Sequence, residues 1–419
     1  MLKALKKLQI NEQNTQSFLL LLFFTFITYN LFHSIIFFEA LKFRIDNSDG
    51  YALGDWLINF EDGGFKRRGL GGSFFLWVSR LTNVYVGNLV YYFILFFYFL
   101  FFGLTWFYLK SKKISLQFWA ILLTPSCFLF FVNDQYAFGR KEILLFTIGI
   151  LYLVLSQKNK IREWKYSILI ATLIFVFSFF HELIFFYLPY FVIIAYIHSK
   201  QNNLQLPIKQ LGLIVLSSFI PTVLIFFLGG DINQGQTWAV LKEYGVKEAI
   251  MEGIMSWPKE GFSGDKQNAL KFAGEHNYKT YFISFSITYI PILLFVIKSK
   301  TTLLTLKNFV LVSLAALLFS WPIFFLTIDW GRWLNIHFIF IIFTFTLFLP
   351  SFNSENNQVY SIKKKPLLNI KSFLTTSTLL IFMLLNLFSW SMKHVDTGFK
   401  FEKNNTYLTV RKILLSFKN

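Results

Sequence analysis

Long apolar runs recur along this chain and constrain its fold more than any other feature. Each run of roughly 20 apolar residues is long enough to cross a hydrocarbon layer of about 30 Å as a helix. A β-barrel would instead show segments of about 10 residues with alternating polarity. The mean hydropathy of +0.52 and the 15% of charged residues also lie outside the range of soluble domains. The sequence therefore predicts an all-α, polytopic integral membrane protein.

We expect about 11 transmembrane helices in a single membrane domain that spans residues 1–419. The first run follows Lys3, Lys6 and Lys7 and has no small-residue cleavage site, so we interpret it as a permanent helix and not a cleaved signal. The lone Cys127 excludes an internal disulfide framework. The expected spans are 17–38, 86–109, 114–132, 143–157, 166–181, 183–198, 210–228, 280–297, 304–328, 333–350 and 370–390.

Basic residues in the short connections indicate the orientation of these helices. Lysine and arginine collect on the cytoplasmic side of membrane proteins. This rule predicts a cytoplasmic N-terminus and, after eleven crossings, an outer C-terminus. The basic connections are Lys110 to Lys113, Lys158 to Lys165, Lys200 with Lys209, Lys298 to Lys307, and Lys363 to Lys371.

The acidic residues provide an independent check of this topology. On the predicted path, the cytoplasmic segments contain 19 of the 40 basic residues but only three acids, Glu12, Glu163 and Glu355, and so carry a net +16. The outer segments carry a net +2 and nearly every carboxylate. Most of the overall +18 therefore reflects topology and contact with anionic lipids, and it does not suggest a nucleic-acid partner.

Three outer segments are longer than a turn. The first outer loop, 39–85, contains a stretch from Leu70 to Leu81 with the pattern of an interfacial amphipathic helix. The second, 229–279, is a mixed-charge stretch that contains Trp238 and Trp257, and we expect it to form a small helical cap. The third is the C-terminal tail, 391–419.

The first outer loop also contains the most polar stretch of the chain, from Asp55 to Gly72. Arginine offers bidentate donors to phosphate, and glycine lets backbone N–H groups approach an anion. The alternative is a basic interfacial stop beside lipid headgroups. The positive-inside rule and the adjacent acids both argue against that alternative. The charged residues of this stretch are Asp55, Glu61, Asp62, Lys66, Arg67 and Arg68.

Two further polar islands lie in predicted outer turns. The loop from Asp134 to Glu142 contains Arg140 and could equally form a self-paired turn. His181 and Glu182 stand side by side among apolar residues, where polar groups are costly unless they are paired or catalytic. A zinc-protease motif would need a second histidine at position 185, which is a phenylalanine.

Asp329 and Arg332 lie at the outer mouth of a predicted helix. Their spacing of three residues places them on one helical face, so a local ion pair is a serious alternative to a binding role. The flanking tryptophans also match an interfacial belt. His337, deeper in the helix, is as well explained by a buried histidine with a hydrogen-bond partner as by a site residue.

These four islands are distant in sequence, yet all are predicted to emerge at the same membrane face. If they converge, cations could bind a phosphate leaving group and carboxylates could transfer protons. The catalytic candidates are Asp55, Glu61, Asp62, His181 and Glu182. The substrate-binding candidates are Lys66, Arg67, Arg68, Arg140, Asp329, Arg332, Trp238 and Trp257. We predict no metal ligands and no cofactor, and whether a divalent cation assists stays open.

This architecture resembles the C-type glycosyltransferases, multi-spanning enzymes that use polyprenyl-linked sugars. The resemblance lies in an outward-facing site and in a first outer loop with an acidic pair, here Glu61 and Asp62. In that family an acid of this loop acts as a base or a metal ligand, which by position could be either of these residues or Asp55. The chain is also similar in gross architecture to bacterial O-antigen and capsule polymerases, whose paired arginine loops are matched only loosely by Arg67 with Arg68 and Arg140.

The resemblance implies a glycosyltransferase of surface-polysaccharide assembly in the bacterial inner membrane, with its site facing the periplasm. The expected substrate is an undecaprenyl diphosphate-linked oligosaccharide, and membrane lipids, a chain-length regulator or other assembly proteins are the partners to consider. Polymerase and single-sugar transferase stay open as alternatives. A flippase or transporter of lipid-linked oligosaccharides is a further alternative. It would place polar groups near the bilayer midplane, whereas the polar islands of this chain are predicted at the outer mouths of the helices. An acyltransferase would use a membrane histidine such as His181.

Overall fold

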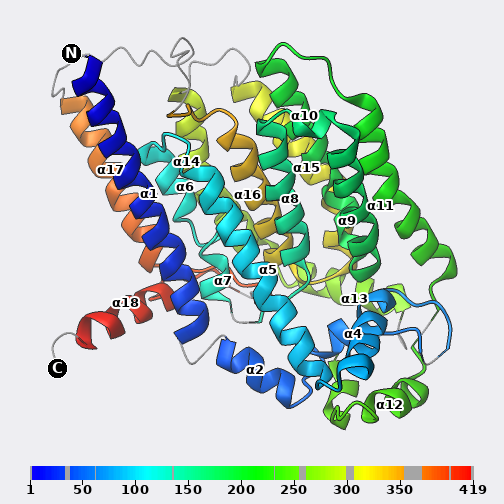
Figure 1. Ribbon diagram of the computed structural model, residues 1–419. Coiled ribbons are helices and arrows are strands. Elements are labelled where there is room, and N and C mark those ends of the chain that lie inside the picture. Colours follow the sequence, from blue (N-terminus) through cyan, green and yellow to red (C-terminus); the bar gives the residue numbers. More distant parts are fainter. Residues whose placement is uncertain are drawn as a thin grey trace. The chain divides into compact units, whose positions relative to one another are not determined.

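The computed structural model describes most of the chain, and the helices are labelled in Figure 1. Within this part of the chain all regular secondary structure is helical, and no strand forms. The all-α prediction is therefore confirmed. The described residues are 2–33, 38–61, 63–134, 136–230, 232–253, 261–298, 306–352, 370–395 and 398–416.

The chain divides into two compact units, which we call the central and terminal units. The central unit comprises Ile35–Leu104 and Phe138–Asn268. The terminal unit comprises Met1–Ser34, Thr105–Ala137 and Ala269–Asn419. We predicted a single membrane domain over residues 1–419. Whether the two units form one such domain stays a prediction.

The central unit contains most of the helices that matter for the site. Its elements are α2 (Phe38–Asp46), α3 (Gly54–Leu57), α4 (Gly69–Thr82), most of α5 (Val86–Leu109), α8 (Glu142–Gln157), η1 (Lys160–Arg162), α9 (Trp164–Phe180), η2 (Glu182–Tyr187), α10 (Leu188–Gln201), α11 (Ile208–Leu228), α12 (Gln234–Lys242) and η3 (Glu248–Met251). Helix α13 (Gly261–Gly274) runs from this unit into the terminal one. The predicted helix at Leu70–Leu81 is present as α4.

The terminal unit is built from helices at the two ends of the sequence and one short middle segment. Its elements are α1 (Leu2–His33), α6 (Leu116–Leu122), α7 (Phe130–Asn133), α14 (Tyr278–Lys298), α15 (Leu306–Leu326), α16 (Trp330–Thr346), α17 (Ile370–Phe388) and α18 (Asn405–Ser416). Helix α18 lies within the predicted C-terminal tail, 391–419.

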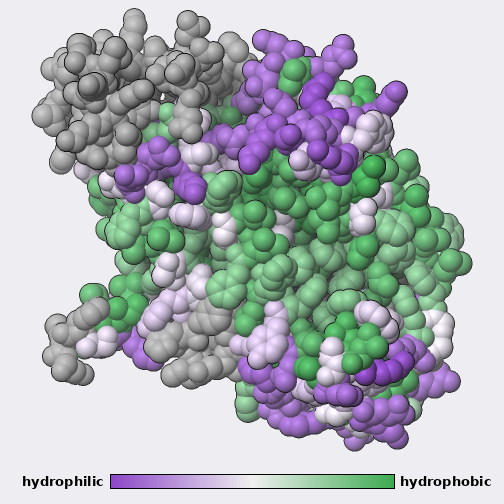
Figure 2. Space-filling model, in the orientation of Figure 1, coloured by the Kyte–Doolittle hydropathy of each residue, from purple (hydrophilic) through white to green (hydrophobic). Residues whose placement is uncertain are grey.

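Several helices of the described chain are suited to a membrane. Val86–Leu109, Glu182–Gln201 and Ile208–Leu228 are long and apolar enough to cross one, and four shorter apolar helices accompany them. On the face of the central unit shown in Figure 2, hydrophobic atoms lie between hydrophilic ends. Phe226 and Phe227 of α11 are 71% and 74% accessible. Apolar side chains at such exposure are costly in water and suit lipid.

The expected helix 114–132 is not continuous, and that prediction was wrong. Helix α6 ends at Leu122, a series of turns follows, and α7 begins only at Phe130. Pro125 lies in the turns, where its missing N–H and its ring oppose a continuous helix. The Thr124 hydroxyl donates to the Ile121 carbonyl, which satisfies a backbone group at the break.

Three glycines of α4 allow this helix to pack closely on its neighbours. A Cβ on Gly72 would lie 2.1 Å from the Ile58 carbonyl oxygen, and one on Gly69 would lie 2.1 Å from the Phe60 ring. A Cβ on Gly71 would come within 2.9 Å of the Phe180 ring. These glycines therefore have a packing role, and whether their backbone N–H groups also approach an anion stays a prediction.

The two predicted outer loops of the central unit contact each other. The Lys247 backbone N–H donates to the Ser48 hydroxyl, and its ammonium donates to the Asn47 side chain, both at 2.8 Å. Lys66 and Gly230 form an isolated parallel backbone bridge. The 229–253 region therefore contacts the 39–85 segment and contains the helices α12 and η3. Whether it forms an outer cap stays a prediction.

Replacing Gly72 by alanine should destabilise the protein by about 1–3 kcal/mol, because the new methyl group would meet backbone that cannot rotate away. Gly103→Ala is the matched control, since nothing lies within 4 Å of its Cβ position and alanine favours a helix. Thermal unfolding of the two purified variants in detergent measures the difference. Equal melting temperatures would contradict the close packing of α4.

Candidate functional site

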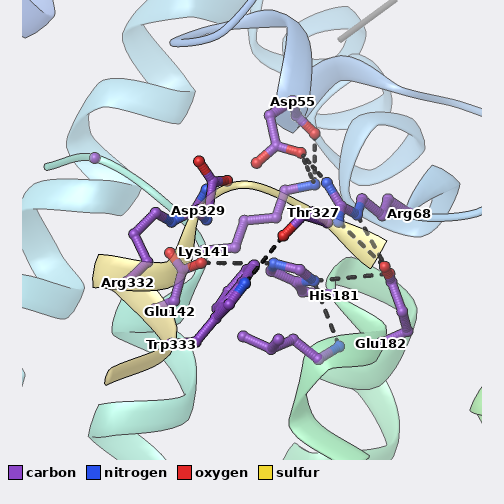
Figure 3. Close-up of polar contacts among 12 residues, drawn as sticks. Asp55, Arg68, Lys141, Glu142, His181, Glu182, Thr327, Asp329, Arg332 and Trp333 are labelled. Atoms are coloured by element: carbon purple, nitrogen blue, oxygen red, sulfur yellow. Dashed lines mark hydrogen bonds and ion pairs between the residues drawn. The ribbon is translucent and has the colours of Figure 1, made fainter. Parts of the chain in front are cut away.

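Three polar segments that are distant in the sequence meet inside the central unit. They are the first outer loop with Asp55 and Arg68, the N-terminus of α8 with Lys141, and the junction of α9 and η2 with His181 and Glu182. Figure 3 shows their side chains pointing toward one another. We call the cluster of Asp55, Arg67, Arg68, Lys141, Glu142, His181 and Glu182 the central charge cluster.

Glu182 is held by two arginines. Arg68 forms a fork with it, Nε to Oε2 at 3.2 Å and Nη2 to Oε1 at 3.1 Å. Arg67 Nε donates to the same Oε1 at 2.7 Å. Charge-assisted forks of this kind are among the stronger and more directional hydrogen bonds in proteins. The carboxylate therefore fixes both guanidinium groups.

Asp55 lies deeper and is shared by two cations. Its Oδ1 accepts from Arg68 Nη1 at 3.0 Å and lies 3.5 Å from Lys141 Nζ. Lys141 also donates to the Asp55 backbone carbonyl. The Asp55 side chain is 2% exposed and that of Lys141 is fully buried. Burying such charges is costly unless they are paired, so these contacts are required for the fold of the loop.

Burial and neighbouring charges shift the pKa values of both Asp55 and Lys141. Burial alone would raise the pKa of Asp55, but the charges of Lys141 and Arg68 outweigh it and hold that pKa well below its usual range. Burial lowers the pKa of Lys141 to about 8, although the Asp55 charge opposes the change. Asp55 is therefore ionised at neutral pH and is a weak proton acceptor.

His181 lies between two carboxylates. Its Nε2 is 3.7 Å from Glu142 Oε1 and its Nδ1 is 3.7 Å from Glu182 Oε2. All three side chains are largely buried. A carboxylate beside an imidazole orients the ring. The arrangement therefore holds the imidazole between two acidic side chains.

Local backbone conformation places these side chains. Arg68 has φ +65° and directly precedes α4, a left-handed conformation that residues other than glycine adopt at an energetic cost. His181 is extended between α9 and η2, with its imidazole near the Leu183 N–H. Glu142 begins α8, where a carboxylate is favoured by the helix dipole.

Other candidates in the first outer loop lie outside the cluster. Glu61 is exposed and paired with Arg80 at 2.8 Å, and Tyr244 donates to the same carboxylate at 3.3 Å. Lys66 is buried, and this burial lowers its pKa. Asp62 lies outside the described residues, so its role stays a prediction.

Arg140 is near the cluster, and its charge acts on Asp55. Its guanidinium carbon lies 5.9 Å from the Tyr51 ring centroid. Trp238 lies half-buried on α12, whereas Trp257 lies outside the described residues.

Asp329 and Arg332 belong to the terminal unit, where they form a local ion pair of 2.6 Å. The Arg332 guanidinium also lies over the Trp333 ring, and the Trp333 indole donates to Thr327. This is the pairing that their spacing suggested. Their role as substrate-binding residues stays a prediction.

Several residues that the structure makes prominent were not among the predicted site residues. Lys141 and Glu142 lie at the end of the predicted loop that contains Arg140. Their position directly before an apolar helix is the sequence feature that could have identified them. In the terminal unit, His394 Nδ1 lies 2.7 Å from Asp134 Oδ2. No local pattern links two residues that are 260 positions apart.

Removing the Asp55 charge should destabilise the protein strongly. Asp55→Asn leaves the buried Lys141 without its carboxylate, at an expected cost of about 3–5 kcal/mol. The double variant Asp55→Asn with Lys141→Met should recover part of this loss because it removes the stranded cation. Asp46→Asn is the control, since its ion pair with Lys42 is exposed and should contribute at most about 1 kcal/mol. Chemical or thermal unfolding measures the free energy of unfolding of each variant. An Asp55→Asn variant as stable as the wild type would contradict the pairing.

The cluster brings together donors for an anion and a proton acceptor beside them. Among the residues that the structure describes, no group of three or more His, Cys, Asp or Glu side chains is arranged to hold a metal ion. No protein-family model, curated protein or solved structure matches this chain. The function is therefore inferred from the chemistry of the cluster.

Proposed function

We propose that this chain is a membrane glycosyltransferase of bacterial surface-polysaccharide assembly. In this proposal it joins oligosaccharides carried on undecaprenyl diphosphate at the outer face of the inner membrane. The observation that carries the proposal is the central charge cluster, in which two arginines, a lysine and a histidine from three distant segments share buried carboxylates.

The proposed topology has eleven crossings, of which the third is the interrupted segment 114–132, with a cytoplasmic N-terminus and an outer C-terminus. The three long apolar helices and the exposed apolar surface of the central unit support a membrane location. The side assignment follows from the basic connections and from the carboxylates gathered on the opposite side.

Arg67 and Arg68 are the proposed ligands of the diphosphate. Their guanidinium groups already converge on one carboxylate oxygen of Glu182, the geometry in which two arginines would bind a phosphate oxygen. As the glycosidic bond breaks, negative charge grows on the leaving diphosphate, and fixed cations stabilise it. Arg140 adds positive charge nearby.

His181 is the group best placed to take the acceptor proton. The carboxylates of Asp55 and Glu182 both bind guanidinium groups, which makes them weaker proton acceptors. The imidazole instead lies between Glu142 and Glu182, which would orient it as a general base. Asp55 then has a positioning role, because it holds Arg68 and Lys141.

The proposed reaction is a displacement at the anomeric carbon of the donor sugar. The acceptor hydroxyl oxygen forms the new bond to this carbon and loses its proton to His181. The bond from the same carbon to the diphosphate oxygen breaks, and its electron pair leaves with undecaprenyl diphosphate. The partly exposed Trp238 on the outer cap is a candidate for stacking on a sugar ring.

Arg68→Ala should reduce product formation by at least about a hundredfold, because it removes an electrostatic donor from the developing charge. The measurement uses purified protein in liposomes with lipid-linked oligosaccharide and follows the length of the glycan. Arg162→Ala is the control, since its guanidinium binds the Gln205 carbonyl at the connection between α8 and α9. Full activity of Arg68→Ala would refute the phosphate site.

The same assay separates the alternatives. Longer chains indicate a polymerase, and addition of one sugar indicates a single-sugar transferase. Translocation across the vesicle membrane without a new glycosidic bond indicates a flippase and would refute the proposed chemistry.

Activity should fall as the pH rises through about 8, where Lys141 loses the charge that holds Asp55. The loss would not reflect unfolding. An unfolded chain keeps this proton up to about 10.5, so the cost of burying charged Lys141 is greatest below pH 8 and is relieved as the pH rises. Lys141→Arg, whose guanidinium stays protonated, should extend the active range. A pH–rate profile that is identical for both proteins above pH 8 would contradict this role of Lys141.

A further inference from the structure

The Glu182 carboxylate lies where two arginines would hold an anionic ligand. Arg67 and Arg68 both donate to Oε1, and Arg68 also donates to Oε2. A phosphate group offers the same kind of acceptor, with oxygens that match the guanidinium fork. Glu182 and an incoming phosphate would therefore compete for the same donors.

Exposure decreases steadily from one end of the cluster to the other. The Arg67 side chain is 40% exposed, those of Arg68 and Glu182 are 14% and 16% exposed, and that of Asp55 is 2% exposed. An anion from solvent or from the membrane surface would meet Arg67 first. Glu182 is then the first carboxylate it has to replace.

Arg68 would keep its position if Glu182 moved away. Its Nη1 also binds Asp55 Oδ1 at 3.0 Å, and Asp55 is held in turn by the buried Lys141. The displaced carboxylate would have a new partner as well, since Glu182 Oε2 already lies 3.7 Å from His181 Nδ1. Exchange of Glu182 for a phosphate would leave both arginines paired and would place the carboxylate beside His181.

We propose that Glu182 is an internal substitute for the substrate phosphate. It keeps Arg67 and Arg68 in their binding arrangement in the resting protein and is displaced by a diphosphate group. Its movement toward His181 would then support the imidazole when that ring accepts a proton. This inference rests on the proposed function and adds a competition between an internal carboxylate and the ligand.

The test measures binding of inorganic diphosphate to the full-length protein in nanodiscs by calorimetry. Glu182→Gln removes the competing charge at nearly constant shape and should tighten binding by about tenfold, since hydrogen bonds to a charged group are worth more than to a neutral one. Glu182→Ala, which leaves no acceptor at all, should tighten binding at least as much. Product formation is measured alongside and should fall in both variants.

Two controls separate competition from general electrostatics. Glu142→Gln removes one negative charge from the same cluster at a carboxylate that contacts His181. Asp49→Asn removes one from the bidentate pair with Arg44 elsewhere in the first outer loop. Both should bind diphosphate within about twofold of the wild type, because neither frees Arg67 or Arg68.

The possible outcomes distinguish the two levels of the proposal. If wild type binds diphosphate and both Glu182 variants, folded as judged by thermal unfolding, bind it no more tightly, the substitute role is refuted and the phosphate site stands. If no protein binds diphosphate, both the inference and the phosphate site are refuted. Equal tightening by Glu142→Gln would also refute the specific competition.

A second arm identifies the source of the phosphate. Nanodiscs that contain undecaprenyl diphosphate should lower the apparent affinity of the wild type for inorganic diphosphate, because both ligands require the same arginines. In Glu182→Gln, the same loss of apparent affinity for inorganic diphosphate should appear at a lower content of undecaprenyl diphosphate. Unchanged affinity for inorganic diphosphate in the presence of the lipid would refute a lipid-linked ligand at this position.

Discussion

The burial of Asp55 between Lys141 and Arg68 is the interaction on which the rest of the site depends. A carboxylate that is 2% exposed beside a fully buried ammonium is stable only as part of a pair. This pairing joins the first outer loop to the start of α8, and Arg68 extends the connection to Glu182. Three segments that are far apart in the sequence are thereby held as one cluster.

Close packing of α4 makes this connection possible. Arg67 and Arg68 directly precede Gly69, and the glycines of α4 let the helix approach Ile58 and Phe180 without a side chain between them. The left-handed backbone of Arg68 is the energetic cost of this sharp entry into the helix. Packing and electrostatics thus support the same arrangement. The proposed exchange of Glu182 takes place beside Arg67, the most exposed side chain of the pairs in the cluster.

Much of this site could be predicted from residue type and position. Charged residues in an apolar chain are expected to have partners, and the sequence contains an arginine pair, a His-Glu pair and several acids. Within the central unit, contacts do connect Asp55, Arg68, His181 and Glu182. Glu61 looked equivalent to Asp55 in sequence, yet it lies at the surface with Arg80. Sequence position alone could not separate the two, because burial depends on how the loop folds onto distant helices.

The sequence by itself determined the helical class, most helix positions and the segments that carry charge, because apolar periodicity and the cost of polar groups in apolar surroundings act locally. It misjudged the segment interrupted at Pro125, which it predicted as one continuous helix. Only the tertiary structure decided which carboxylate each cation binds, and it placed Lys141 and Glu142 in the cluster. The pairings of Lys141 with Asp55 and of Arg68 with Glu182 join residues 86 and 114 positions apart, which no local pattern encodes.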